Sequence, residues 1–245
     1  MKTQKSQKSI NFSRYAFFFP MHRLNPQKTK IMLTKTYNPQ KFNKLFLNKF
    51  DSYGYDFAQC FDDFLTITIC CFARGTEEPL YLETIKKYKK SDLSDFAEML
   101  GRMWVEYLLN IENKTWSDPL GELYEEITSK HKSQRLGQFF TPIDICNLMA
   151  RITMKKDEFG EFINDPCSGS GRMLLASESV SKGNYCIGAD IDPICAKMSA
   201  LNLALHGIKG EIWHGDSLAN KYYKVYIINH DYWKTKAPSI FTKFV

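Results

Sequence analysis

The chain has 245 residues, 44% of them apolar, and a formal net charge of +6, which is enough for one large hydrophobic core or two smaller ones. No apolar run approaches the roughly 20 residues of a membrane-spanning helix, and Phe17–Phe19 is too short for the core of a signal peptide. The seven cysteines are odd in number and form no CxxC pair, which favours reduced cysteines in a cytoplasmic protein over a disulfide framework or a zinc site.

The first fifty residues are strongly basic. They contain eleven of the 33 Lys and Arg residues and no Asp or Glu, so the rest of the chain is acidic on balance. We predict that residues 1–40 form a basic, flexible arm. Two interpretations carry equal weight: the arm neutralises phosphates of a nucleic acid, or it is a solvated, disordered leader.

Residues 41–135 are predicted to form a helical domain. Apolar and aromatic side chains recur there at helical spacing, which indicates core-facing helices. Two such stripes stand out: Phe57, Phe61, Phe64, Thr68 and Phe72, and then Leu93, Phe96, Leu100, Met103, Trp104 and Tyr107. Asp118 and Pro119 have the form of an N-cap and first-turn proline, opening a helix with one apolar face: Leu120, Leu123, Tyr124 and Ile127.

Residues 136–245 have the alternating strand and helix pattern of a Rossmann-like α/β domain. Strands are expected near 161–164, 185–189, 210–213 and 224–228, and helices near 172–181 and 193–206. The run Thr141–Asp144 has the form of a capping box with Pro142 at the first helical position. The helix that follows would have one apolar face, made of Ile145, Leu148, Met149 and Ile152.

The run Asp165-Pro-Cys-Ser-Gly-Ser-Gly171 lies between a predicted strand and a predicted helix. Glycines in that position let a backbone turn tightly beside a nucleotide-type cofactor. Asp190 ends the next strand, where a carboxylate accepts hydrogen bonds from ribose hydroxyls. Asp192 and Pro193 read as an N-cap and a first helical residue. Asp216, after the third strand, is placed to accept a bond from an amino group of the cofactor base.

Four runs taken together, 137–142 (GQFFTP), 165–171 (DPCSGSG), 188–193 (GADIDP) and 215–218 (GDSL), resemble the N6-adenine DNA methylases, especially methylase subunits of type I restriction-modification systems. The resemblance implies an N-terminal helical domain followed by a partial Rossmann-like methyltransferase domain at 136–245. It also implies S-adenosylmethionine as cofactor, with its methionine end near Phe139, its ribose at Asp190 and its adenine at Ile191. The implied cofactor residues are Gln138, Phe139, Thr141, Asp165, Cys167, Gly169, Gly171, Asp190, Ile191, Asp216 and Ser217.

The catalytic motif departs from that family. The family pattern is Asn-Pro-Pro followed by an aromatic residue, and this chain has Asn229-His-Asp-Tyr232. By resemblance, Asn229 would accept a hydrogen bond from the target amino group and Tyr232 would stack on the flipped base. The two missing prolines would have fixed the backbone that presents a carbonyl to the base.

The resemblance predicts an adenine-N6 DNA methyltransferase of a restriction-modification system, with DNA and a specificity or completing methylase subunit as partners. A noncatalytic accessory subunit that binds cofactor or DNA is the alternative. An NAD-type dehydrogenase is a more distant one, and the 138–142 run argues against it. Because only residues 233–245 follow the motif, we expect four parallel strands with an open edge. A fragment, a degenerate domain and a subunit completed by another chain all fit this expectation.

Overall fold

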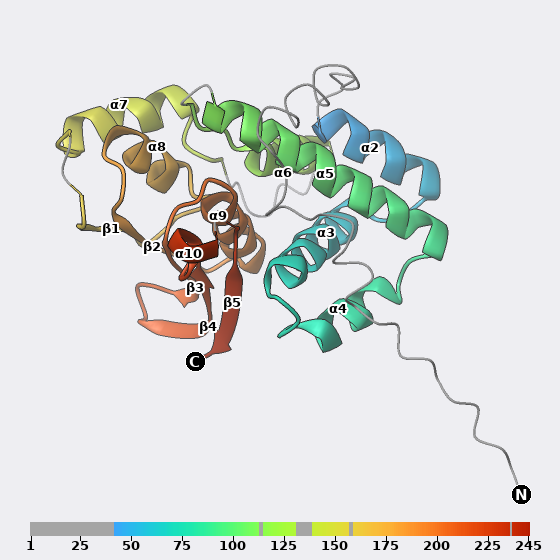
Figure 1. Ribbon diagram of the computed structural model, residues 1–245. Helices are drawn as coiled ribbons and strands as arrows, with labels where there is room; N and C mark the ends of the chain where they lie inside the picture. The colour runs from blue at the N-terminus through green and yellow to red at the C-terminus, as the bar shows by residue number, and fades with distance from the viewer. Residues whose placement is uncertain (1–41, 113–114, 131–138, 157–158, 236) are drawn as a thin grey trace, which may run out of the picture. The chain divides into compact units, whose positions relative to one another are not determined.

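The computed structural model describes residues 42–112, 115–130, 139–156, 159–235 and 237–245, which belong to one compact unit (Figure 1). The predicted basic arm and Gln138 lie outside these residues. The described part is a mixed α/β structure in which helices precede a five-stranded sheet. No helix of the described part is long and apolar enough to cross a bilayer.

The N-terminal part is helical, as the aromatic spacing predicts. Its helices are α2 (Phe42–Tyr53), α3 (Phe57–Phe72), α4 (Glu78–Ile85), α5 (Lys90–Glu112) and α6 (Pro119–Lys130). Asp56 caps α3 by accepting a bond from the Gln59 backbone N–H at 2.8 Å. The β-branched run 66–69 stays helical because these four residues are buried in an aromatic core, where packing outweighs intrinsic propensity. The rings of that core contact one another edge-on or tilted, with centroids 4.7–6.1 Å apart: Phe42, Phe46, Phe50, Phe61, Phe64 and Phe96.

The sheet has the strand order β1-β2-β3-β4-β5. Its strands are β1 (Phe162–Asp165), β2 (Tyr185–Asp190), β3 (Gly210–Asp216), β4 (Lys221–Ile228) and β5 (Ile240–Phe244). The first three are parallel and are joined by α8 (Arg172–Val180) and α9 (Pro193–Leu205), which confirms the predicted strand-helix alternation. Two further helices are α7 (Ile143–Thr153) and the short α10 (Tyr232–Thr235).

The fourth strand runs antiparallel to β3, so the predicted parallel arrangement was wrong. Only residues 217–220 separate β3 from β4, and a parallel connection needs a crossover of about a dozen residues or more. Asp216 closes the hairpin turn by accepting from the backbone N–H groups of Leu218 and Ala219, both at 2.9 Å. The expected absence of later strands was also wrong, because β5 pairs antiparallel with β4.

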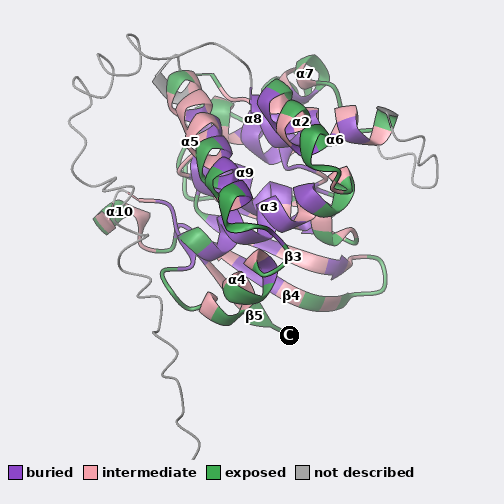
Figure 2. Ribbon diagram, turned by 90° about the vertical axis from the view of Figure 1, so that its right-hand side faces the viewer, coloured by how far each residue is buried: buried purple, intermediate pink, exposed green. Residues whose placement is uncertain are grey.

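Helix α9 is the centre of the structure. It packs on β2, β3 and β4, while α3 packs against it and α8 packs on β1. Figure 2 shows α9 and α3 as mostly buried, in contrast to α2 and α5, whose outer faces are exposed. Asp192 caps α9 as predicted and accepts from the Ile194 backbone N–H at 2.8 Å.

Helix α7 packs through the face that the sequence pattern did not indicate. Its buried residues are Cys146 and Ala150, whose small side chains allow α7 to lie close to Ala176 of α8. The predicted apolar face is exposed instead: Ile145, Leu148, Met149 and Ile152. The predicted capping box is not formed, because Pro142 is the N-cap and no side chain bonds there.

Asn229, directly after β4, is buried and has a left-handed backbone (φ 55°). Its side-chain amide donates to the carbonyl oxygens of Ala204 at 3.1 Å and Ile208 at 2.9 Å, where α9 ends. Its side-chain oxygen accepts from the Ser239 backbone N–H at 3.1 Å. Asn229 thus adds side-chain hydrogen bonds to buried backbone groups at the end of α9 and at Ser239.

Replacing Asn229 with Ala is expected to lower the free energy of unfolding by about 1 to 3 kcal/mol more than Asn220→Ala does, because buried hydrogen bonds to Ile208 and Ser239 are lost. Asn220 is a matched control, since it is exposed and has a similar φ of 50°. Denaturant unfolding of both variants measures the difference. Equal losses would contradict this structural role of Asn229.

Candidate functional site

Three carboxylates stand where the parallel strands end. Asp165, Asp190 and Asp216 are the last residues of β1, β2 and β3, and parallel pairing brings these carboxyl ends to one edge of the sheet. Open α/β sheets bind ligands at that edge. The loop after β1 folds over it, and the Ser168 backbone N–H donates to the Ala189 carbonyl at 2.8 Å.

The glycines of this loop are required by its shape. Gly169 and Gly171 have φ values of 54° and 90°, a region that disfavours other residues. A Cβ on Gly169 would lie 2.9 Å from the Phe140 ring, and one on Gly171 would lie 2.8 Å from the Ser199 hydroxyl. Gly171 is also the N-cap of α8. The loop therefore depends on glycine for both its turn and its close packing.

A cavity of about 200 Å³ opens at this edge. Its lining includes six of the predicted cofactor residues: Phe139, Thr141, Asp165, Cys167, Gly169 and Asp190. Six further lining residues were not predicted: Phe140, Ser168, Ser170, Arg172, Met173 and Cys195. Phe140, Ser168 and Ser170 lie inside the two predicted motif runs, and Arg172 and Met173 directly follow the second run, so their sequence positions could have indicated them. No local pattern marks Cys195, which reaches the cavity from the first turn of α9.

The other predicted cofactor residues that the structure describes lie outside the cavity. Gly171 is the N-cap of α8, and Ile191 is exposed. Asp216 caps its own hairpin turn. Ser217 lies beside the loop, because its hydroxyl donates to the Pro166 carbonyl at 2.7 Å. This bond holds the β3–β4 hairpin against the loop 165–171.

The predicted catalytic residues do not reach the cavity. Because β4 is antiparallel, its last residue Ile228 pairs with Gly210, the first residue of β3. Asn229 and Tyr232 therefore follow the edge opposite to the carboxyl ends of β1–β3. The Tyr232 ring packs against Gly207, just beyond α9. The tetrapeptide that resembles the family's catalytic motif therefore lies at the end of the sheet opposite to the cavity.

The two lining carboxylates sit in partly buried surroundings. Burial raises the pKa of both Asp165 and Asp190, and the nearby Asp190 charge raises the pKa of Asp165 further. Asp190 accepts from the backbone N–H groups of Gly169 at 2.8 Å and Asp192 at 2.9 Å. Among the residues that the structure describes, Arg172 is the one cation in the lining, and Asp118 and Glu125 neutralise it. This electrostatic balance favours a ligand with positive charge.

The sequence profile described as N-6 DNA Methylase matches residues 115–240, slightly more than half of the chain. The chain belongs to the N-6 DNA methylase family. It is 29% identical over 152 residues to the type I restriction enzyme MjaVIII methylase subunit of Methanocaldococcus jannaschii, a match that covers 57% of this chain and 26% of that protein. It is 30% identical over 124 residues to the MpnII methylase subunit of Mycoplasma pneumoniae, covering 46% of this chain and 23% of that protein.

A crystal structure of a type I restriction-modification methyltransferase subunit from Streptococcus thermophilus is also similar. It is 17% identical, with a TM-score of 0.42, and the match covers 87% of this chain and 49% of that one. This N-6 DNA methylase family member matches about a quarter of the length of the two curated relatives.

Gly171→Ala is expected to destabilise the protein more than Gly183→Ala. Both glycines have φ near 90°, so each substitution costs about 1 to 2 kcal/mol in backbone strain. Only at Gly171 does the added methyl meet a close neighbour, which adds about 1 to 3 kcal/mol of overpacking. Thermal or denaturant unfolding gives the comparison, and equal losses would mean that the loop can move away from α9.

Proposed function

We propose that this chain provides the S-adenosylmethionine site of an adenine-N6 DNA methylase of a restriction-modification system. The observation that carries the proposal is the cavity at the carboxyl ends of β1 and β2, lined by two carboxylates within the family-matched region. S-adenosylmethionine has a sulfonium and an ammonium group, so it is a cation of the kind that this lining favours. When bound, it supplies an activated methyl group.

The lining residues fit such a cofactor. Each oxygen of Asp190 accepts one backbone N–H and keeps a lone pair for a ribose hydroxyl. Asp165, with one bond to the Cys167 N–H at 3.1 Å, has acceptor capacity left for an ammonium group. The Phe139 ring is 90% exposed at the cavity, where its face is free to contact a sulfonium. The cavity is small, so the adenine would extend past it toward Ile191.

The charge of the cavity argues against the dehydrogenase alternative. A dinucleotide places its pyrophosphate on the glycine-rich loop. Here that anion would lie beside Asp165 and Asp190, while the nearby Arg172 is already paired with two carboxylates. Repulsion between like charges in a partly buried site would weaken such binding.

The described part of the chain does not bring a target-base site to this cavity. The Asn229 side chain donates to backbone carbonyls at the end of α9, and Tyr232 packs on Gly207. We propose that the groups that accept the amino protons of the target adenine come from a completing methylase subunit or another part of the protein. In the alternative, an accessory subunit that only binds cofactor or DNA, no such groups are needed.

Cofactor binding tests the proposal first. S-adenosylmethionine should bind the purified chain in calorimetry, and Asp190→Ala should weaken binding by about 1 to 3 kcal/mol through lost hydrogen bonds. Glu211→Ala is the matched control, because Glu211 bonds to Tyr185 and Trp213 at the other end of β3. No heat of binding in the wild type would contradict the proposal, and equal affinity in Asp190→Ala would remove that residue from the site.

Methyl transfer by the chain alone tests the second part. With labelled S-adenosylmethionine and mixed-sequence DNA, we expect no incorporation into adenine, because Asn229 and Tyr232 lie away from the cavity. Cofactor binding is verified on the same sample. Incorporation that disappears in Asn229→Ala would contradict this placement and make the tetrapeptide a working catalytic loop.

A further inference from the structure

We propose that Arg172, Asp118 and Glu125 are positioning residues that hold the two sides of the cavity in register. The first side is the segment 139–141, and the second is the loop 165–171. We call these three residues the Arg172 cluster. The inference deepens the proposed function, because it rests on that cavity being the cofactor site.

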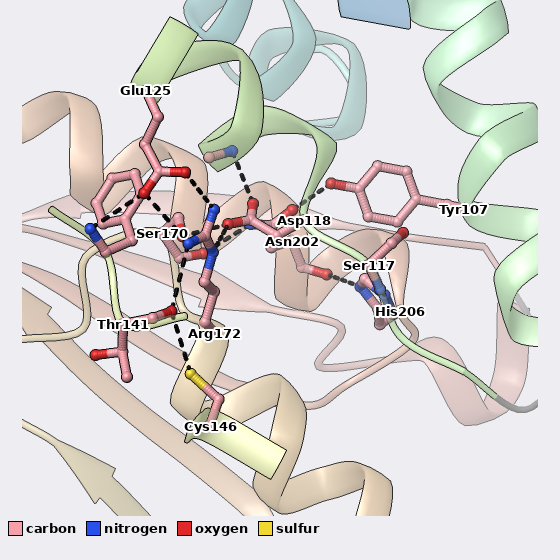
Figure 3. Close-up of polar contacts among 12 residues, drawn as sticks. Tyr107, Ser117, Asp118, Glu125, Thr141, Cys146, Ser170, Arg172, Asn202 and His206 are labelled. Carbon is pink, nitrogen blue, oxygen red and sulfur yellow. Dashed lines mark hydrogen bonds and ion pairs between the residues drawn. The ribbon is translucent and has the colours of Figure 1, made fainter. Parts of the chain in front are cut away.

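Arg172 is the first residue of α8 and is buried. Its Nε donates to Asp118 Oδ2 at 2.7 Å, and one terminal nitrogen donates to Glu125 Oε2 at 3.0 Å (Figure 3). The other terminal nitrogen donates to the Thr141 carbonyl at 3.3 Å, and the guanidinium lies 5.2 Å from the centre of the Phe140 ring. A planar fork with several donors can make all of these contacts at once, and a lysine cannot. Arg172 thus contacts the first side of the cavity through a carbonyl and a ring.

Asp118 holds the second side. Its buried carboxylate accepts from the Ser170 hydroxyl at 2.5 Å and from the Asn202 side-chain amide at 2.7 Å, as Figure 3 shows. The same Asn202 amide donates to the Ser170 carbonyl at 2.7 Å. Ser170 lies between the two glycines of the loop, so its hydroxyl and its carbonyl are both fixed. The sequence pattern indicated Asp118 only as the N-cap of α6, a role confirmed by its bond to the Gly121 N–H at 2.8 Å.

Glu125 bonds both to Arg172 and to the first side of the cavity. Its Oε1 accepts from the Phe140 backbone N–H at 3.3 Å and from Arg172 at the same distance. Asp118 and Glu125 both come from the start and first turns of α6, so a helix distant in sequence from the loop sets the loop's position. Burial raises the pKa of Asp118, and the charge of Arg172 opposes that rise.

This geometry indicates positioning in addition to stability. The bonds of the cluster end on backbone or side-chain atoms of residues that line the cavity: Phe140, Thr141, Ser170 and Arg172 itself. The loop glycines have no side chains to restrain them, so these bonds limit how far the loop can open. A site that is fixed before binding loses less entropy when the ligand arrives.

Glu125→Ala is the decisive variant, because the Glu125 side chain is 35% exposed and its removal leaves the buried Asp118–Arg172 pair intact. In the ligand-free protein we expect the Phe140 amide to exchange hydrogen about tenfold faster. Affinity for S-adenosylmethionine in calorimetry should fall about five- to tenfold, with little change in melting temperature. Glu125→Gln should recover most of both effects, since an amide oxygen still accepts from Phe140. Glu126→Ala, the adjacent residue of the same charge, should behave as wild type.

A second variant, Arg172→Lys, keeps the charge and loses the fork. It should speed exchange at Phe140, since the first side of the cavity loses the bonds that the guanidinium makes to Thr141 and Glu125. Unchanged exchange and unchanged affinity in Glu125→Ala would overturn the proposal, as would equal effects from Glu126→Ala. If the wild type does not bind S-adenosylmethionine, the proposed function fails, and the exchange rates still decide whether the cluster positions the cavity.

Discussion

The buried ion pair between Arg172 and Asp118 is the interaction on which the candidate site depends. Both charges are removed from water, so the loss of Arg172 would leave the Asp118 carboxylate uncompensated at a cost of several kcal/mol. The pair joins α6 to the start of α8, which directly follows the loop 165–171. The helical part of this N-6 DNA methylase family member is therefore not an appendage to the sheet, because it supplies the carboxylates that hold the loop.

The reversal of chain direction at residues 217–220 is the second constraint. It turns β4 antiparallel and sends Asn229 to the edge of the sheet opposite to the cavity. There its side chain bonds to backbone carbonyls at the end of α9, which packs on the sheet. A side chain whose sequence context resembles a catalytic asparagine therefore serves the fold.

The site itself is defined by charge. Two carboxylates share a partly buried cavity, and the guanidinium beside them is neutralised by its own partners. Burial opposes ionisation of both carboxyl groups, as their raised pKa values reflect. A cationic ligand relieves this cost, and an anionic one adds to it. This balance supports the proposed S-adenosylmethionine site more directly than the glycine loop does, since glycine loops also bind phosphates.

The sequence by itself determined the features that depend on local chemistry. Aromatic spacing predicted α3, Asp192 predicted the start of α9, and the glycine loop predicted the turn between β1 and α8. Tertiary structure alone decided the direction of β4, the buried face of α7 and the partners of Arg172. The physical reason is that periodicity and turn residues act between near neighbours. Strand pairing, the choice of packing face and a buried ion pair depend on which distant segments meet.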